Sequence, residues 1–450
     1  MTYLTTTYST IQEFEKLPAS AVELSLEDIN KSIEITTEFS SEQIKWQIYI
    51  NHLALCVFQK WLLNREDKLD IVIDKCTLFT PAIATFVDAI GKLQVGEFKI
   101  CLLTVASLTD EKVSIPRAVI DLPEYIPHFY VLVEVLEEEE MGIISGFIPY
   151  DQLVKQKIDT QIQPDEDWIY EIPLTWFNNN LDTLLLYLRC LEVTTISLPI
   201  IPNHSHNLST IGNELALLLP ELKEKELKSV LNWEQGSLIL TIPELFNWVY
   251  QLQSQPKNTT NNLYLKQHLV DLIKLLSQPV LNVGRWLSDE LDEIAKELSW
   301  VLLPSLSLAS EMKPMRTPEE ELEVIIRQLH QKGLEIPTQA RGAYQDFKLV
   351  GIPLRLYAVT WHLLEEYVSP EWTLLLILGA PALSSLPSNL KLRISDQIGI
   401  LVDQGLNPAS GDSYLFTRVV GGWEEKFIVS ISLMDGIEVT LPTFSFNLET

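Results

Sequence analysis

Residues 427–441 read FIVSISLMDGIEVTL, and this stretch decides how the C-terminal part of the chain is interpreted. Apolar side chains at Phe427, Val429, Ile431 and Leu433 alternate with their neighbours, and a strand places alternate side chains on opposite faces. Asp435-Gly436 follows, a pair that tolerates the positive φ angles of a tight hairpin turn, and a second apolar run occupies 437–441. The stretch therefore predicts a β-hairpin.

The sequence around this hairpin predicts more strands. Gly421-Gly422 joins the run 414–420 onto the same meander, and residues 390–395 alternate in the same way. Turn signals at this spacing indicate a β-sandwich of about seven or eight strands. The predicted fold class is α+β, with helical segments and two antiparallel β domains, of which the C-terminal one is the β-sandwich. Such a fold displays loops but carries no chemistry by itself.

The length of 450 residues predicts several domains, because one hydrophobic core stops growing well below that size. We expect four segments: an N-terminal helical segment at 1–66, a β-rich domain with an acidic hairpin at 67–200, a helical domain at 201–316, and a capped linker helix followed by the β-sandwich at 317–450.

Charge limits the partners. With 33 Lys and Arg against 61 Asp and Glu, the formal net charge is −28. Phosphate backbones and anionic lipid surfaces need basic residues, so we expect neither nucleic acid nor membrane as a partner. The first residues are polar and Thr-rich, without the pattern of a signal peptide, and the most apolar stretch, at 372–383, is too short to span a bilayer. We expect a cytoplasmic protein.

The N-terminal segment has the pattern of helices at 20–66. Ser40 and Gln43 make a capping-box pattern, and an apolar stripe follows at helical spacing. The stripe consists of Trp46, Ile50, Leu53, Val57 and Trp61. His52 and Cys56 lie beside it. They have two interpretations, a thiol nucleophile with its base or neighbours in a helix core, and the core is favoured. We also expect Cys56, Cys76, Cys101 and Cys190 to be buried free thiols.

The most distinctive feature of the second segment is an acidic hairpin. Apolar runs at 129–136 and 142–150 flank Glu137, Glu138, Glu139 and Glu140, whose charges must lie in water. The four glutamates are interpreted as a solvated turn or, more specifically, as a binding site for a basic protein partner. A divalent cation site is less favoured, because the spaced ligands of a calcium loop are absent. Further strands are predicted at 69–73 and 98–105, and a buried helix at 181–191.

The third segment predicts helices at 208–219, 243–253, 262–277 and 283–300, with prolines such as Pro220 marking their ends. His204 and His206 make a His-x-His pair, but a metal site needs further ligands. Thr317, Pro318 and Glu320 then predict a capped helix that ends at Gly333.

The arrangements that catalysis requires are missing from the sequence. Gly91-Lys92 lacks the earlier glycine and the hydroxyl of a phosphate-binding loop, and no nucleophile elbow or zinc motif is present. His362 and Glu365 are three residues apart, so on a strand they would face opposite sides. We therefore assign no catalytic, cofactor-binding or metal-binding residues and expect no cofactor.

The chain resembles a cyanobacterial family of uncharacterised proteins, a domain of unknown function. The matching pieces are Trp46-x-x-Tyr49-x-Asn51-x-Leu53 with Trp61-Leu62, Tyr130-Val131-Leu132-Val133 leading to Gly146-Phe147-Ile148-Pro149, Asn282-Val283-Gly284-Arg285-Trp286-Leu287, and the strand within 422–433. The chain departs from the family pattern at Trp423-Glu424-Glu425 and at the acidic hairpin tip. Genes of this family lie near those of sigma factors and of caspase-like or tetratricopeptide-repeat signalling proteins. The resemblance therefore implies a regulatory or adaptor role, and it supplies no catalytic residues.

Together these features predict a non-catalytic cytoplasmic adaptor or regulatory protein, which binds another protein through the β-sandwich loops or the acidic hairpin. The alternative is an enzyme, such as a hydrolase, with a site assembled from dispersed residues; it predicts a deep pocket with at least two groups of perturbed pKa. A third interpretation is a self-assembling structural protein, which long unprotected edge strands would favour.

Overall fold

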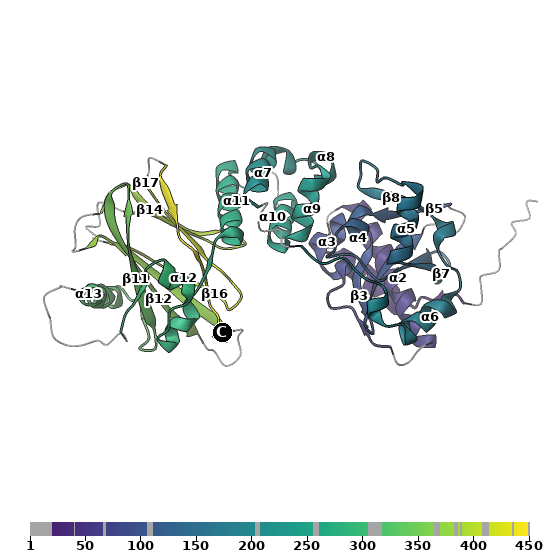
Figure 1. Cartoon of the computed structure of the whole chain (residues 1–450), viewed down its shortest axis with the longest axis horizontal. Helices are drawn as coiled ribbons and strands as arrows, with labels where there is room; N and C mark the ends of the chain where they lie inside the picture. Colours follow the sequence, from purple (N-terminus) through teal and green to yellow (C-terminus); the bar gives the residue numbers. More distant parts are fainter. Residues whose placement is uncertain are drawn as a thin grey trace, which may run out of the picture. The chain divides into compact units, whose positions relative to one another are not determined.

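The structure is a computed structural model that describes residues 20–39, 41–65, 69–105, 111–202, 208–254, 261–304, 317–363, 370–381, 386–387, 389–406, 414–433 and 436–448. The chain divides into two compact units (Figure 1). The first contains residues 1–203 and 226–247, and the second contains residues 204–225 and 248–450. Both units combine helices with sheets, so the predicted α+β class is confirmed.

The first unit is built on a six-stranded sheet. Its strands, in spatial order, are β1 (Val22–Glu23), β7 (Met141–Pro149), β6 (Phe129–Leu136), β4 (Phe98–Val105), β3 (Ile90–Val95) and β2 (Ile71–Val72). The hairpin predicted around the acidic residues is confirmed as the antiparallel pair β6 and β7. The prediction that this sheet is wholly antiparallel is wrong, because β4 and β6 run parallel. Parallel neighbours need a crossover connection, because the chain must return to the same end of the sheet, and the segment between β4 and β6 is long enough for this.

A long helix fills the core of this unit. Helices α1 (Leu26–Thr36) and α2 (Glu42–Arg65) confirm the predicted helical region, and α2 packs against β4, β6 and β7. Leu53, Val57 and Trp61 are buried, whereas Trp46, at the start of the predicted stripe, is 58% exposed. In the middle of α2, residues on every side of the helix are buried. The helix therefore lies inside the core and has no solvent-exposed face there, unlike an amphipathic surface helix. Ser40, the predicted cap, lies outside the described residues.

Shorter elements complete the first unit. The helices are α3 (Pro81–Phe86), α4 (Arg117–Asp121), α5 (Tyr150–Thr160), α6 (Leu181–Cys190), α8 (Leu227–Val230) and α9 (Trp233–Thr241), with 3-10 turns η1 (Thr77–Phe79), η2 (Leu174–Trp176) and η3 (Val193–Thr195). A separate antiparallel pair joins β5 (Lys112–Pro116) to β8 (Ile169–Pro173). The helix predicted at 181–191 is confirmed, but it buries only Leu184 and Leu188 fully. The sequence prediction missed α5.

The second unit contains the predicted β-sandwich. One sheet has the order β10 (Val301–Leu302), β11 (Arg341–Leu349), β12 (Ile352–Leu363), β13 (Glu371–Gly379) and β16 (Tyr414–Gly422). The other has the order β15 (Ile400–Gly405), β14 (Leu390–Ser395), β17 (Ile428–Leu433) and β18 (Glu438–Thr440). Both are antiparallel, and their inner side chains share one apolar core. A short parallel pair, β9 (Val280–Asn282) with β19 (Thr443–Ser445), lies beside them.

The hairpin predicted at 427–441 is confirmed as the pair β17 and β18, although Met434 and Asp435 lie outside the described residues. The prediction that 414–420 extends the same meander is wrong, because β16 pairs with β13 in the other sheet. The chain changes sheet immediately after β16. Gly421 permits this crossing, since a Cβ atom there would lie 2.7 Å from the ring of Phe427.

The predicted capped helix is confirmed as α13 (Pro318–Gln331). The Thr317 hydroxyl accepts a hydrogen bond from the Glu320 amide, and Gly333 follows the helix with a φ of +88°. The helix packs on the outer face of the five-stranded sheet (Figure 1). Arg355 of β12 fixes it there through an ion pair of 2.8 Å with Glu321.

The remaining helices of the 204–304 region are α7 (Leu208–Leu222), α10 (Pro243–Ser254) and α11 (Asn262–Ser277), followed by a 3-10 helix η5 (Val283–Ser288) and α12 (Glu293–Glu297). The bounds predicted for α11 agree with the structure. Pro220 does not end α7 but lies inside its last turn. The single helix predicted at 283–300 is wrong, because that stretch forms two short helices separated by Asp289, which has a positive φ.

A buried ionic network attaches α11 to the four-stranded sheet. Asp271 of α11 accepts two hydrogen bonds from Arg393 of β14, of 2.8 and 3.0 Å, and one from the Ser395 hydroxyl. Arg393 also donates to Glu438 of β18, and Lys274 donates to the same carboxylate. Asp271 is 1% exposed, so its charge depends on these partners for stabilisation.

Candidate functional site

The predicted partner-binding residues form the turn between β6 and β7. Glu137, Glu138, Glu139 and Glu140 are all exposed, and the register pair of Leu136 with Met141 closes the turn behind them. The Glu140 amide donates to the Glu137 carbonyl at 3.1 Å, and Glu140 has a φ of +53°. The turn thus presents four carboxylates to solvent from a single closed loop.

Two other parts of the first unit hold this turn, one through its backbone and one through a side chain. The Leu24 amide, next to β1, donates to the Glu140 carbonyl at 2.8 Å. From α2, the Tyr49 hydroxyl donates to the Glu137 carboxylate at 3.3 Å. Burial raises the pKa of Tyr49, and the charge of Glu137 raises it further, so the phenol stays a donor at neutral pH. The acidic tip is therefore a fixed feature of the fold at both of its ends.

His52 and Cys56 are brought together but are not activated. The distance from Cys56 Sγ to His52 Nδ1 is 3.8 Å, and the same nitrogen faces the Ser32 hydroxyl at 2.7 Å. Burial raises the pKa of the Cys56 thiol to about 11 and lowers that of His52. A nucleophilic cysteine needs a lowered pKa, so the geometry supports a role in the core.

The four cysteines are free thiols. Cys56, Cys76 and Cys101 are buried as predicted, whereas the prediction for Cys190 is wrong, because this residue is exposed at the last position of α6. Leu184 and Leu188 of that helix are fully buried, and Leu181, Leu185 and Tyr187 pack against the same core, whereas Cys190 ends the helix in an exposed position.

Within the described parts of the chain, no three His, Cys, Asp or Glu side chains are grouped to hold a metal ion. His204, His206 and Glu365 lie outside those parts. None of the described helices combines the length and the apolar character needed to cross a bilayer.

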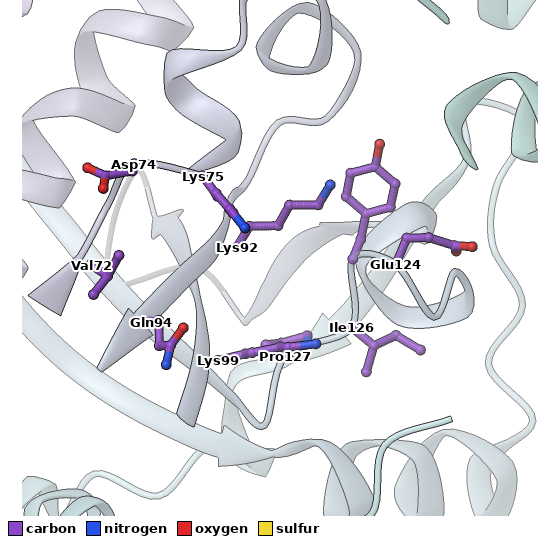
Figure 2. A pocket seen from close by; sticks show the side chains of 10 residues that line it. Val72, Asp74, Lys75, Lys92, Gln94, Lys99, Glu124, Ile126 and Pro127 are labelled. Atoms are coloured by element: carbon purple, nitrogen blue, oxygen red, sulfur yellow. The ribbon is translucent and has the colours of Figure 1, made fainter. Parts of the chain in front are cut away.

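The structure reveals a pocket of about 410 Å³ in the first unit that the sequence prediction missed (Figure 2). Lys75 follows β2, Lys92 and Gln94 lie on β3, and Lys99 lies on β4, where it is in register with Gln94. The loop that leads into β6 closes the other side with Glu124, Tyr125, Ile126 and Pro127. Three lysines from three separate stretches of the chain thus line the pocket.

Local hydrogen bonds fix this loop beside the strands. The Lys99 amide donates to His128 Nδ1 at 2.8 Å, and the His128 amide donates back to the Lys99 carbonyl at 2.8 Å. Burial, aided by the charge of Lys99, lowers the pKa of His128 to about 4, so the ring is a neutral acceptor at pH 7. The Tyr125 hydroxyl donates to the Leu240 carbonyl at 2.8 Å. The pocket wall is therefore anchored on both sides.

In the sequence, the sole signal for this pocket is Gly91-Lys92, which by itself is an incomplete phosphate-binding loop. In the structure the two residues form a β-bulge: Ile90 pairs with Leu102 and Leu93 with Ile100, so both residues oppose Cys101 alone. A β-bulge inserts an extra residue and so interrupts the alternation of buried and exposed side chains. Strand prediction relies on that alternation and therefore does not reveal a bulge.

Comparison with known proteins assigns the chain to a family but not to a function. Neither the curated proteins nor the solved structures contain a significant match. A family model described as "Protein of unknown function (DUF1822)" matches residues 22–440, which cover both units. The chain therefore belongs to the DUF1822 family.

Proposed function

We propose that this protein is a non-catalytic cytoplasmic adaptor or regulatory protein, which binds a basic segment of another protein through the acidic tip Glu137, Glu138, Glu139 and Glu140. The observation that carries the proposal is the combination of exposure with an ordered turn: four exposed glutamates lie on a turn whose Glu140 carbonyl is bound by Leu24 and whose Glu137 carboxylate is bound by Tyr49. The cyanobacterial source and the regulatory setting are part of the proposal, and the family resemblance supports them.

A fixed tip favours binding for an energetic reason. Holding four like charges together costs electrostatic free energy, which a basic partner would recover. Because the turn is already ordered, the loss of conformational entropy on association is smaller than for a flexible acidic segment. Contacts of this kind mainly accelerate association and weaken steeply with salt.

The predicted second surface, the loops of the β-sandwich, remains part of the proposal. Several of these loops, at 364–369, 382–385 and 407–413, lie outside the described residues. The hairpin is therefore the part of the proposal for which the structure supplies specific residues to test.

The test compares two pairs of substitutions that remove the same charge. E138Q/E139Q neutralises the middle of the tip, and E166Q/D167N neutralises two exposed carboxylates in another loop of the same unit. Each tagged full-length protein is used to isolate partners from lysate of the native host, with quantitative mass spectrometry at low and at physiological salt.

We expect the wild-type chain and E166Q/D167N to recover the same basic protein, and E138Q/E139Q to lose it. Loss of about two close charge pairs corresponds to roughly a tenfold weaker affinity or more. Equal recovery with both double variants would show that the tip is only a solvated turn.

A further inference from the structure

The pocket between β2, β3, β4 and the loop into β6 is lined by more lysines than carboxylates, although the protein as a whole is strongly acidic. Lys75, Lys92 and Lys99 line it, and in the part of the chain that the structure describes none of their ammonium groups takes part in an ion pair. Asp74 and Glu124 also line the pocket. Figure 2 shows their carboxylates at opposite ends, directed away from the ammonium group of Lys92. The three lysines thus retain capacity for an anion.

Lys92 is held in the pocket at a cost in backbone energy. Its φ is +57°, a left-handed conformation that favours glycine, and it is the second residue of the β-bulge. The Thr77 hydroxyl accepts a hydrogen bond from the Gly91 amide at 2.8 Å, which satisfies the backbone where the bulge interrupts the ladder. Bulges and left-handed non-glycine residues are concentrated at functional sites, where they direct a side chain toward a ligand.

The side chain of Lys92 is partly removed from water. Its Nζ lies 4.5 Å from the centroid of the Tyr125 ring, which is 4% exposed. Burial lowers the pKa of Lys92 in spite of the nearby Glu124 carboxylate, and the charge of Lys99 acts in the same direction as burial. A bound anion would stabilise this desolvated cation more than an exposed one.

The rest of the pocket suits an organic group. Its volume of about 410 Å³ is far larger than a phosphate ion needs and lies in the range of small-molecule sites. Ile126, Pro127 and the Tyr125 ring supply an apolar wall opposite the polar strand residues. The pocket therefore combines one charged region with one apolar region.

We propose that this pocket binds a small organic phosphate, with Lys75, Lys92 and Lys99 holding the phosphate and the Ile126–Pro127 wall contacting the organic group. A phosphate monoester offers three terminal oxygens and up to two negative charges to three ammonium groups, whereas a carboxylate offers two oxygens and one charge. This inference stands independently of the proposed function, since it uses residues of a different surface.

The first experiment measures lysine reactivity in the wild-type protein. The full chain is acylated briefly with an amine-specific reagent in a low-salt buffer free of phosphate, with and without phenyl phosphate, and each lysine is quantified by mass spectrometry. Phenyl phosphate should slow the acylation of Lys75, Lys92 and Lys99 several-fold and leave the exposed Lys112 and Lys155 of the same unit unchanged. Unchanged rates at all three pocket lysines would overturn the proposal.

The second experiment separates binding from folding. Lys92→Gly removes the ammonium group but suits the left-handed backbone, so we expect it to unfold at the same temperature as the wild-type protein or a higher one. Its affinity for phenyl phosphate, measured by calorimetry, should fall about tenfold or more, because a charge-assisted hydrogen bond to the anion is lost. The matched control K155M should bind like the wild-type protein.

Two further ligands test the chemical class. Benzoate retains the ring with a carboxylate, and inorganic phosphate retains the anion without the ring, so both should bind more weakly than phenyl phosphate. Equal affinity for benzoate would refute the assignment to phosphate, and equal affinity for inorganic phosphate would refute the role of the apolar wall. Binding of phenyl phosphate that K92G leaves unaltered would place the ligand elsewhere.

Discussion

Removal of Arg393 should destabilise the second unit more than removal of its partner Asp271. In Arg393→Met, the donors that remain for Asp271 among the described residues are neutral, the Ser395 hydroxyl at 2.7 Å and the Gln267 amide at 3.2 Å, while the carboxylate stays buried. A buried charge left without its counter-ion costs about 3 to 5 kcal/mol. In Asp271→Leu, Arg393 still binds Glu438 at 2.8 Å, so the cost should be about half as large.

The assay is urea unfolding of the full chain, followed by circular dichroism and tryptophan fluorescence, for the two single variants and for R393M/D271L. The double variant replaces the ion pair with apolar side chains, so it should cost less than the sum of the single variants by about 1 kcal/mol or more. A cost below about 1 kcal/mol for R393M, or a cost smaller than that of D271L, would refute the reasoning.

Three other predictions follow from local interactions. Burial raises the pKa of Glu438, but hydrogen bonds from Lys274 and Arg393 outweigh this effect and lower the pKa from 4.5 to about 2. Between these pH values the folded state binds fewer protons than the unfolded state, so the free energy of unfolding should decrease as the pH falls from 4.5 toward 2. Urea midpoints measured over that range should decrease less for Glu438→Gln than for the wild-type protein. Alkylation of the native protein at pH 7.5 should modify Cys190 and leave Cys56 unmodified, because Cys56 is buried with a pKa of about 11; rapid Cys56 modification in peptide maps would contradict this. Thr317→Ala should cost about 1 kcal/mol through loss of the α13 cap, whereas Thr317→Asp should not, and equal midpoints for the two variants would contradict the capping role.

The elements that sequence reasoning predicted correctly are those whose signals are local. Thr317 with Glu320 marks the start of α13, the bounds of α11 agree at 262–277, and the acidic turn lies where two apolar runs meet it. Caps, periodicity and turn residues act over a few positions, so a short window contains all of the information that they need.

The errors arise where the fold depends on contacts between distant residues. Nothing near 414–420 indicates that β16 pairs with β13 rather than with β17, because partner choice depends on which faces become buried. The parallel pairing of β4 with β6 is likewise a property of the crossover between them. Pro220 lies inside α7 between the buried residues Leu219 and Leu222, so the burial of the helix overrides the local signal to stop.

The candidate sites divide in the same way. The acidic tip was found because its four glutamates are consecutive, although the bonds from Leu24 and Tyr49 that fix it were not predictable. The lysine pocket was missed because its residues are scattered over four stretches of sequence that the sheet brings together. A bulge at Gly91-Lys92 has no periodic signature, and its role becomes visible only when the strand register is known.

The central claim is that the acidic tip is a protein-binding surface, and hydrogen–deuterium exchange of the isolated complex tests it most directly. The chain is compared alone and with the protein that E138Q/E139Q fails to recover, at equal salt. The account predicts slower exchange of the amides at 137–142 in the complex, with little change at the control loop 165–168. Unchanged exchange at the tip, with protection confined to another surface of the chain, would contradict it.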